Sequence, residues 1–170
     1  MSKSVWIGAG VLLIAALVQG SMLPFIIGSR VPVNLVLVLV IGWALLRGLK
    51  SALIWAVVGG LWLDLLSGVP LGTAMLALSL VAYACTIGVI PWLTSTGLIA
   101  VAVTAGGTLL YTFSYFFLLR TRQLVGGESW LAVWQSHALP AAVTNALVAI
   151  PVFWLLARFA GGAPLRRSAP

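Results

Sequence analysis

The sequence predicts an all-α integral membrane protein with six transmembrane helices. Of its 170 residues, 62% are hydrophobic and only 6% are charged, and the mean hydropathy is +1.19. Apolar stretches of about 15 to 24 residues, long enough to cross a bilayer as helices, recur along the whole chain. Basic residues stand singly or in pairs at the ends of these stretches. This composition excludes an ordinary soluble domain and predicts a single membrane domain.

Apolar runs bounded by Gly, Pro and charged residues predict the six spans in order. The first, 5–27, could instead be a signal peptide with a cleavage site near 18–21, but an uncleaved helix is favoured because the rest of the chain is membrane-like too. The second and third are short, about 17 residues or about 25 Å against a hydrocarbon core of about 30 Å. We expect them to form a tight pair that sits shallow, thins the bilayer or encloses a cavity. The six predicted spans are 5–27, 31–47, 51–67, 71–93, 96–119 and 138–160, which form one domain over 1–160.

The distribution of basic residues predicts that both termini are cytoplasmic. The net charge of +7 could suggest nucleic acid as a partner, but its spread over helix ends follows the positive-inside rule. Residues 161–170 are predicted to be a disordered cytoplasmic tail. Six basic residues would be cytoplasmic, namely Lys3, Arg47, Lys50, Arg158, Arg166 and Arg167, and three would be outside, namely Arg30, Arg120 and Arg122.

Only the segment 120–137 is long enough to form a loop of its own. Ser129 can cap a short helix on which Trp130 and Trp134, four residues apart, share one face. Such a helix would lie in the outer interface with its indoles at headgroup level. An irregular loop with two anchoring tryptophans is the alternative. His137, just before the last span, is expected to be an interfacial residue, not a base.

Asp64, one of two acidic residues in the chain, falls in the third predicted span. Ala52, Ala56, Gly60 and Asp64 recur every four residues, and small residues on one face favour close helix packing, so we expect Asp64 to point into protein. An ionised carboxylate costs about 2.5–3.5 kcal/mol at mid-bilayer and therefore needs a role. Either it binds a proton or a cation, or it accepts N–H groups from the turn 67–70. Its place at a helix end favours the second.

Few other polar residues lie within the predicted spans. Asn34 and Asn145 are expected to form hydrogen bonds across helix contacts, and a ligand-binding role is the alternative. Cys85 is expected to be a small buried side chain. No second carboxylate lies in any predicted span, and no nucleophile–base pair, metal-ligand set or phosphate loop is evident. We therefore predict no catalytic residue, no metal and no cofactor.

Two stretches resemble the rod shape-determining protein MreD family. The first is Pro32-Val33-Asn34-Leu35 at the entry to the second span, and the second is the hairpin GGLWLDLLSGVPLG at 59–72. Gln19 and the stretch 145–151 are weaker echoes, and 120–137 matches nothing in the family pattern. The residues that carry the resemblance are Pro32, Asn34, Gly60, Asp64, Ser67, Gly68, Pro70, Leu71 and Gly72.

The resemblance implies a non-enzymatic, multi-pass subunit of the bacterial elongation complex in the inner membrane, which supports rod shape and peptidoglycan synthesis. The implied partner is the single-span protein MreC and, through it, RodA, a class B penicillin-binding protein and MreB. The surfaces expected to pack against a partner helix carry Ala52, Ala56, Gly60 and Asn145, and small residues are also found at Thr104 and Gly107. Membrane lipid is the other expected contact, and nucleic acid is not.

Two other functions compete with an assembly subunit. The six-span arrangement also resembles the substrate-binding S component of energy-coupling-factor vitamin transporters. In that case Asn34, Asp64 and Asn145 would line an outward pocket for a small molecule. A membrane enzyme acting on lipid-linked substrates is the third reading, and it lacks candidate catalysts.

Overall fold

The computed structural model describes residues 3–22, 32–88, 97–126 and 129–159, and these residues contain helices and no strands. The predicted all-α class is therefore confirmed for the described residues. The predicted tail at 161–170, Arg30 and the ends of the first and fourth predicted spans lie outside them. The elements are α1 (Lys3–Leu17), the π-helix η1 (Val18–Met22), α3 (Leu35–Arg47), α4 (Leu49–Ser67), α5 (Thr73–Gly88), α6 (Gly97–Thr121), α7 (Trp130–Val133), the π-helix η3 (Trp134–Ala138) and α8 (Leu139–Phe159).

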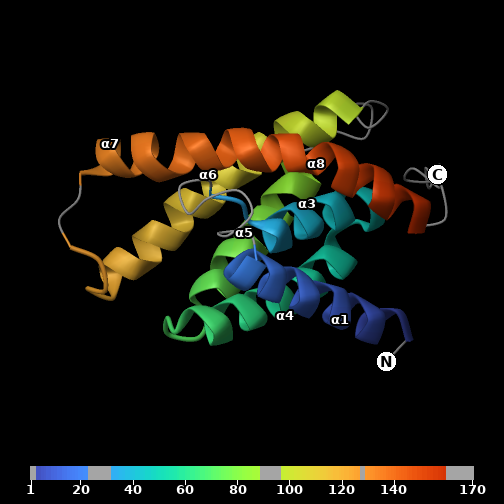
Figure 1. The fold of residues 1–170 in the computed structure, drawn as a ribbon, viewed down its shortest axis with the longest axis horizontal. Helices are drawn as coiled ribbons and strands as arrows, with labels where there is room; N and C mark the ends of the chain where they lie inside the picture. Colours follow the sequence, from blue (N-terminus) through green and yellow to red (C-terminus); the bar gives the residue numbers. More distant parts are fainter. Residues whose placement is uncertain (1–2, 23–31, 89–96, 127–128, 160–170) are drawn as a thin grey trace.

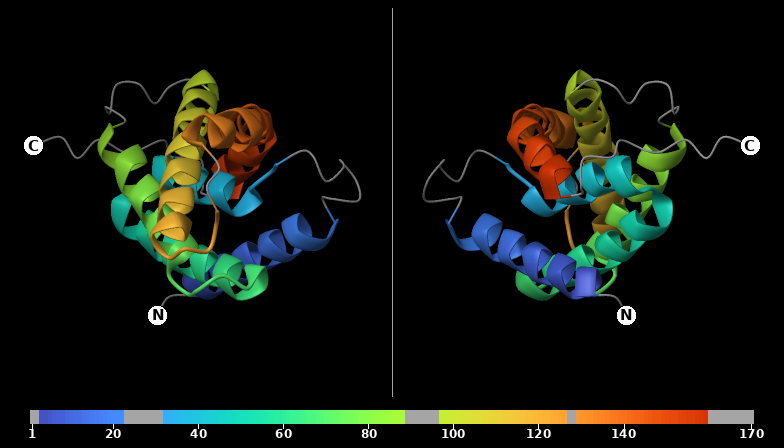
Figure 2. Two further views of the ribbon diagram at one scale, coloured as in Figure 1. Left: turned by 90° about the vertical axis from the view of Figure 1, so that its left-hand side faces the viewer. Right: turned by 90° about the vertical axis from the view of Figure 1, so that its right-hand side faces the viewer.

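The helices form one bundle around an apolar core. In Figure 1, α8 lies along the upper side, α1 and α4 lie along the lower side, and α3 and α5 lie between. Figure 2 shows α6 and α8 next to each other on the side away from α1. The core centres on α3, where Leu37 and Ile41 are fully buried, and it extends to Leu12 of α1 and Leu78 of α5. Cys85 is buried in it, as predicted.

Three helices are long and apolar enough to cross a membrane: Leu49–Ser67, Ile99–Thr121 and Trp130–Phe159. Three more apolar helices, Trp6–Ser21, Leu35–Arg47 and Thr73–Ile87, are shorter. The expectation of two short neighbouring spans is therefore wrong for α4, whose 19 residues extend for about 29 Å. The helix α3 is shorter than expected, because its 13 residues extend for only about 20 Å. The apolar run begins at residue 31, but the helix begins after its cap at Asn34.

The last predicted span is part of a longer helix. Trp130–Phe159 is one continuous run of 30 residues, so α7, η3 and the last span are not separate elements. The predicted cap is present, since the Ser129 hydroxyl accepts the Ala132 N–H at 3.2 Å. No glycine interrupts 130–159, and the π-helical turn η3 lies just before Pro140, whose ring cannot donate an N–H to the preceding turn.

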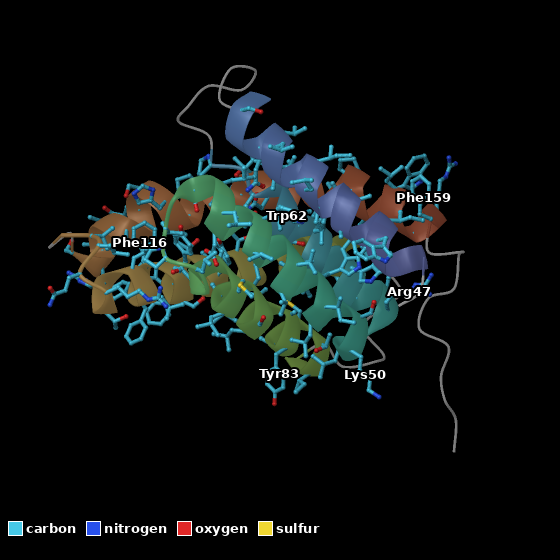
Figure 3. All side chains as sticks on the ribbon, turned by 90° about the horizontal axis from the view of Figure 1, so that it is seen from below. Arg47, Lys50, Trp62, Tyr83, Phe116 and Phe159 are labelled. Carbon is cyan, nitrogen blue, oxygen red and sulfur yellow. The ribbon has the colours of Figure 1, made fainter. Side chains whose placement is uncertain are left out.

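Basic residues lie at the two ends of the bundle. Figure 3 shows Arg47 and Lys50 at the same end as Phe159, while Phe116 lies toward the opposite end. Arg47 stacks on Trp43 with its guanidinium carbon 5.3 Å from the ring centre, and Trp43 in turn stacks on Trp55 at 4.3 Å. Arg47 and Lys50, two of the residues predicted to be cytoplasmic, thus lie at one end of the described part of the chain.

Candidate functional site

The site begins with Asp64, which is 1% exposed and lies in the last turn of α4. The first N–H groups of any helix have no acceptor within that helix. At the start of α5, Asp64 supplies the acceptors: one carboxylate oxygen accepts the Gly72 N–H at 2.8 Å and the Met75 N–H at 3.4 Å, and the other accepts the Ala74 N–H at 2.8 Å. The Thr73 N–H is bonded separately to the Pro70 carbonyl at 3.3 Å. Asp64 therefore caps α5 from a neighbouring helix.

The predicted role of Asp64 as an acceptor of backbone N–H groups is matched by these contacts, but the predicted donors are wrong. They are Gly72, Ala74 and Met75, not residues of the turn 67–70. Pro70 has no N–H to donate, and Ser67 is still part of α4. The unsatisfied N–H groups, together with the positive end of the helix dipole, are at the start of the next helix.

The turn between α4 and α5 has the conformation that its glycines allow. Gly68 ends α4 in the left-handed region at φ 68°, and Gly72 has φ 97°. The Ser67 hydroxyl donates to the Leu63 carbonyl of its own helix at 2.6 Å. The Pro70 carbonyl accepts the Thr73 hydroxyl at 2.8 Å, which closes the turn.

Gly60 permits the close approach of α4 and α5. A Cβ atom at this position would lie 2.6 Å from the Met75 nitrogen and would also collide with the Met75 Cα. Real Cβ atoms do not approach backbone atoms so closely, so any side chain would push the helices apart. Gly60 thus holds the two helices at the separation at which Asp64, one turn along, reaches the start of α5.

Arg122, which the sequence predicts only as a charge on the outer side, also contacts this turn. Its guanidinium donates to the Thr73 hydroxyl at 3.3 Å and to the Pro70 carbonyl at 3.5 Å. The contact ties the end of α6 to the α4–α5 turn. No local signal predicts it, because 49 residues separate Arg122 from Thr73.

A second polar cluster lies at the start of α3, where the predicted Asn34 and Asn145 meet. The Asn145 side chain, fully buried, accepts the Asn34 N–H at 2.8 Å and donates to the Thr108 hydroxyl at 3.3 Å. Asn34 itself caps α3 by accepting the Leu37 N–H at 3.0 Å. Gln19 accepts the Val36 N–H at 3.2 Å. Three side-chain amides from three segments therefore accept N–H groups at the start of α3, namely those of Asn34, Val36 and Leu37.

Pro32 is held at the same place. Its carbonyl accepts the Thr144 hydroxyl at 2.7 Å, which joins the chain before α3 to α8. The predicted hydrogen bonding across helix contacts is confirmed for Asn145. For Asn34 the bond across helices uses the backbone N–H, while the side chain caps its own helix.

A cavity of about 220 Å³ lies beside this second cluster. Asn34 and Asn145 both line it, whereas Asp64 does not, so the three residues predicted to share a pocket are divided between two places. Its full lining is Pro32, Val33, Asn34, Thr108, Tyr111, Thr112, Tyr115, Phe116, His137, Ala141 and Asn145.

The small-residue surfaces expected to receive a partner helix are occupied by the chain itself. Ala52 and Ala56 are fully buried in the core, Gly60 faces Met75, and Asn145 is fully buried between α3 and α6. Gly107 is also enclosed, since a Cβ there would lie 2.7 Å from the Ile41 side chain. These residues are therefore not accessible to a partner helix on the surface of this bundle.

The chemistry available in these clusters is that of helix capping and packing. Among the described residues, no group of three or more His, Cys, Asp and Glu side chains is placed to hold a metal ion. The buried hydroxyls of Thr104, Thr108 and Thr112 donate to carbonyls one turn back on α6. The side chains of Asn34, Asp64 and Asn145 are thus hydrogen-bonded within the chain, mostly to backbone N–H groups.

These features define an all-helical protein with three helices long and apolar enough to cross a membrane, which indicates a membrane protein. Its helices are joined by a carboxylate cap at α5 and an amide cluster at α3. Comparison of the chain with models of protein families, with curated proteins and with solved structures finds no match.

Proposed function

We propose that this chain is a non-enzymatic subunit of the bacterial elongation complex, of the MreD type, which binds an MreC-like single-span protein in the inner membrane. The support is the resemblance of the hairpin 59–72 to the MreD family, since the residues that carry this resemblance together hold α4 against α5. Gly60 allows the close approach, Asp64 caps the next helix, and Gly68 and Gly72 form the turn. A hairpin locked in this way suits a rigid scaffold on which a partner helix can assemble.

The proposal includes six membrane spans in an arrangement similar to that of the S components of vitamin transporters. Besides the three long helices, α1 with η1 extends for about 30 Å, which matches the hydrocarbon core. The helices α3 and α5 extend for only about 20 and 24 Å. They would need local thinning of the bilayer, which costs fractions of a kcal/mol per Å. With both termini cytoplasmic, Arg47, Lys50 and Arg158 would face the cytoplasm, as the positive-inside rule requires.

The partner helix would use an apolar surface that the chain does not bury itself. One such row runs along α8 through Val143, Leu147, Ile150 and Trp154, each more than half exposed and spaced on one helix face. A second row on α5 includes Leu76 and Leu80. Photo-crosslinking residues placed singly at 147 and at 80 would distinguish the two rows.

The test is co-expression of this chain with the MreC-like protein from the same organism, followed by purification through a tag on one of them. The proposal expects both proteins to elute together in detergent. A matched control carries an unrelated transmembrane helix in place of the partner's own helix. Recovery of this chain alone, or equal recovery with the control helix, would contradict the proposal.

A small-molecule binding component of a transporter is the second candidate, and the cavity of about 220 Å³ beside Asn34 and Asn145 favours it. Both amides already serve backbone groups and Thr108, which leaves little of their hydrogen-bonding capacity for a solute. This candidate predicts a ligand that survives purification. A mass spectrum of the purified chain without such a ligand would contradict it.

A further inference from the structure

The helix α8 has a proline in its interior, and this proline removes one backbone hydrogen bond. Pro151 lies within Leu139–Phe159, and the helix continues on both sides of it. Because proline has no N–H, the Leu147 carbonyl, one turn back, lacks its usual helical donor. No proline lies within α3, α4, α5 or α6, so this feature is specific to α8 among these five helices.

The polar side chains in the middle of α8 do not replace the missing donor. The Thr144 hydroxyl donates to the Pro32 carbonyl at 2.7 Å, and the Asn145 amide donates to the Thr108 hydroxyl at 3.3 Å. Within 3–22, 32–88, 97–126 and 129–159, no side chain donates to the Leu147 carbonyl. A donor for this carbonyl therefore has to come from another molecule.

The Leu147 carbonyl lies on a face of α8 that the bundle leaves open. A helix carbonyl points toward the residue four positions on, and both Leu147 and Pro151 are exposed, as is Trp154 on the same face. Arg158, which lies over Trp154 at 3.9 Å, marks the charged end of this face. About 16 Å of helix separates Leu147 from Arg158, or about half the thickness of a hydrocarbon core. Water is not available at that depth to supply the missing donor.

The missing donor distinguishes between the molecules that could cover this face. Lipid acyl chains have no hydrogen-bond donor. A second copy of the chain, packed symmetrically on the same face, would bring Leu147, Ile150 and Pro151 to this level, and none of these has a side-chain donor. Complementarity to the partial negative charge of the carbonyl therefore requires a different helix with a hydroxyl or N–H group in a side chain. The exposed row on α5 makes no such demand, because its helix has no proline.

We propose that the single-span partner packs its membrane helix along this face of α8 and donates a side-chain O–H or N–H to the Leu147 carbonyl. The partner is the one proposed above, so this contact rests on that proposed function and adds the face and the chemistry that the partner uses. Serine, threonine, asparagine, glutamine and tryptophan can supply such a donor. The apolar remainder of the contact is formed by Val143, Leu147, Ile150 and Trp154, each more than half exposed.

The experiment compares complexes of the full chain with the MreC-like protein, co-expressed and purified through a tag on the chain. Pro151→Ala returns a helical N–H to the Leu147 carbonyl. The matched control, Pro140→Ala, changes the same residue type nearer the other end of the helical run Trp130–Phe159. Native mass spectrometry over a dilution series measures the partner retained per chain, and thermal unfolding of each variant without the partner measures folding.

Pro151→Ala should weaken retention of the partner about three- to tenfold, as loss of a hydrogen bond between membrane helices does, without lowering the unfolding temperature of the chain alone. Pro140→Ala should leave retention unchanged. Each polar residue of the partner's membrane helix is then replaced singly by a residue without a donor. One replacement should weaken the wild-type complex by the same factor and have no further effect on the complex of Pro151→Ala.

Three results would overturn this contact and leave the proposed function intact. They are full retention of the partner by Pro151→Ala, equal loss in the two proline variants, and losses that add to that of Pro151→Ala at every position of the partner's helix. Failure of the wild-type chain to retain the partner would overturn both the contact and the proposed function.

Discussion

Replacing Asp64 tests whether the carboxylate cap holds the hairpin of α4 and α5 together. Asp64→Leu removes the acceptors of two N–H groups bonded at 2.8 Å and of a third at 3.4 Å. A hydrogen bond to a charged group contributes about 1.5–3 kcal/mol, so loss of the two short bonds should lower the free energy of unfolding by about 3–6 kcal/mol. The N–H of Ala74 would then remain without an acceptor at a buried position, and the N–H of Gly72 at a half-buried one.

Asp64→Asn should cost about half as much. Its amide keeps one oxygen, which can still accept one of the two short bonds, while its NH₂ group faces the other donor. The assay is reversible unfolding of the purified chain in detergent, followed by far-UV circular dichroism. Ser67→Ala is the control, since the Ser67 hydroxyl is exposed and donates to the carbonyl of Leu63 on its own helix.

The expected order of stability is wild type and Ser67→Ala together, then Asp64→Asn, then Asp64→Leu. If the free energy of unfolding of Asp64→Leu lies within about 0.5 kcal/mol of the control's, the capping role is refuted, because that is the usual range for a surface substitution. An equally large loss in Asp64→Asn and Asp64→Leu would show that the charge itself is required, which favours a bound proton or cation.

The remaining predictions concern other packed positions and use the same unfolding assay. Gly60→Ala should lower the free energy of unfolding by about 1–3 kcal/mol, because the added methyl group forces α4 away from α5. Gly106→Ala, which has open space around it, should raise the free energy of unfolding by up to about 1 kcal/mol, and equal effects of the two variants would contradict the close approach at Gly60. Asn145→Ala should cost about 1–3 kcal/mol because it leaves the Asn34 N–H without its acceptor, and a neutral result would exclude that bond as a source of stability. Gly68→Ala should cost about 1–2 kcal/mol through its left-handed conformation, and no loss would mean that the turn relaxes freely.

The positions of the helices could be predicted from the sequence because apolar runs of membrane length are a strong local signal. Their ends could not always be predicted. The run from residue 31 is apolar, yet α3 begins only after Asn34, which is held by Asn145 from a distant helix. The last helix extends back to Trp130 because the chain has no glycine there to end it, and a π-helical turn accommodates the approach to Pro140.

The candidate site was predictable in its residues more than in its contacts. Asp64 was identified by its rarity and by the cost of a carboxylate in a membrane span. Its donors depend on how closely α4 and α5 approach, and that distance is set by Gly60 against Met75. The contact of Arg122 with Thr73 depends on the packing of α6, which no local pattern encodes.

The central claim is that this chain is an assembly subunit that holds a single-span partner through helix packing. Native mass spectrometry of the chain co-expressed with the MreC-like protein tests it most directly, because the mass reports both the partner and its number of copies. The account predicts a complex of defined stoichiometry that contains both proteins and no small solute. A chain that appears alone and carries a bound solute would contradict it and would move the function to solute binding.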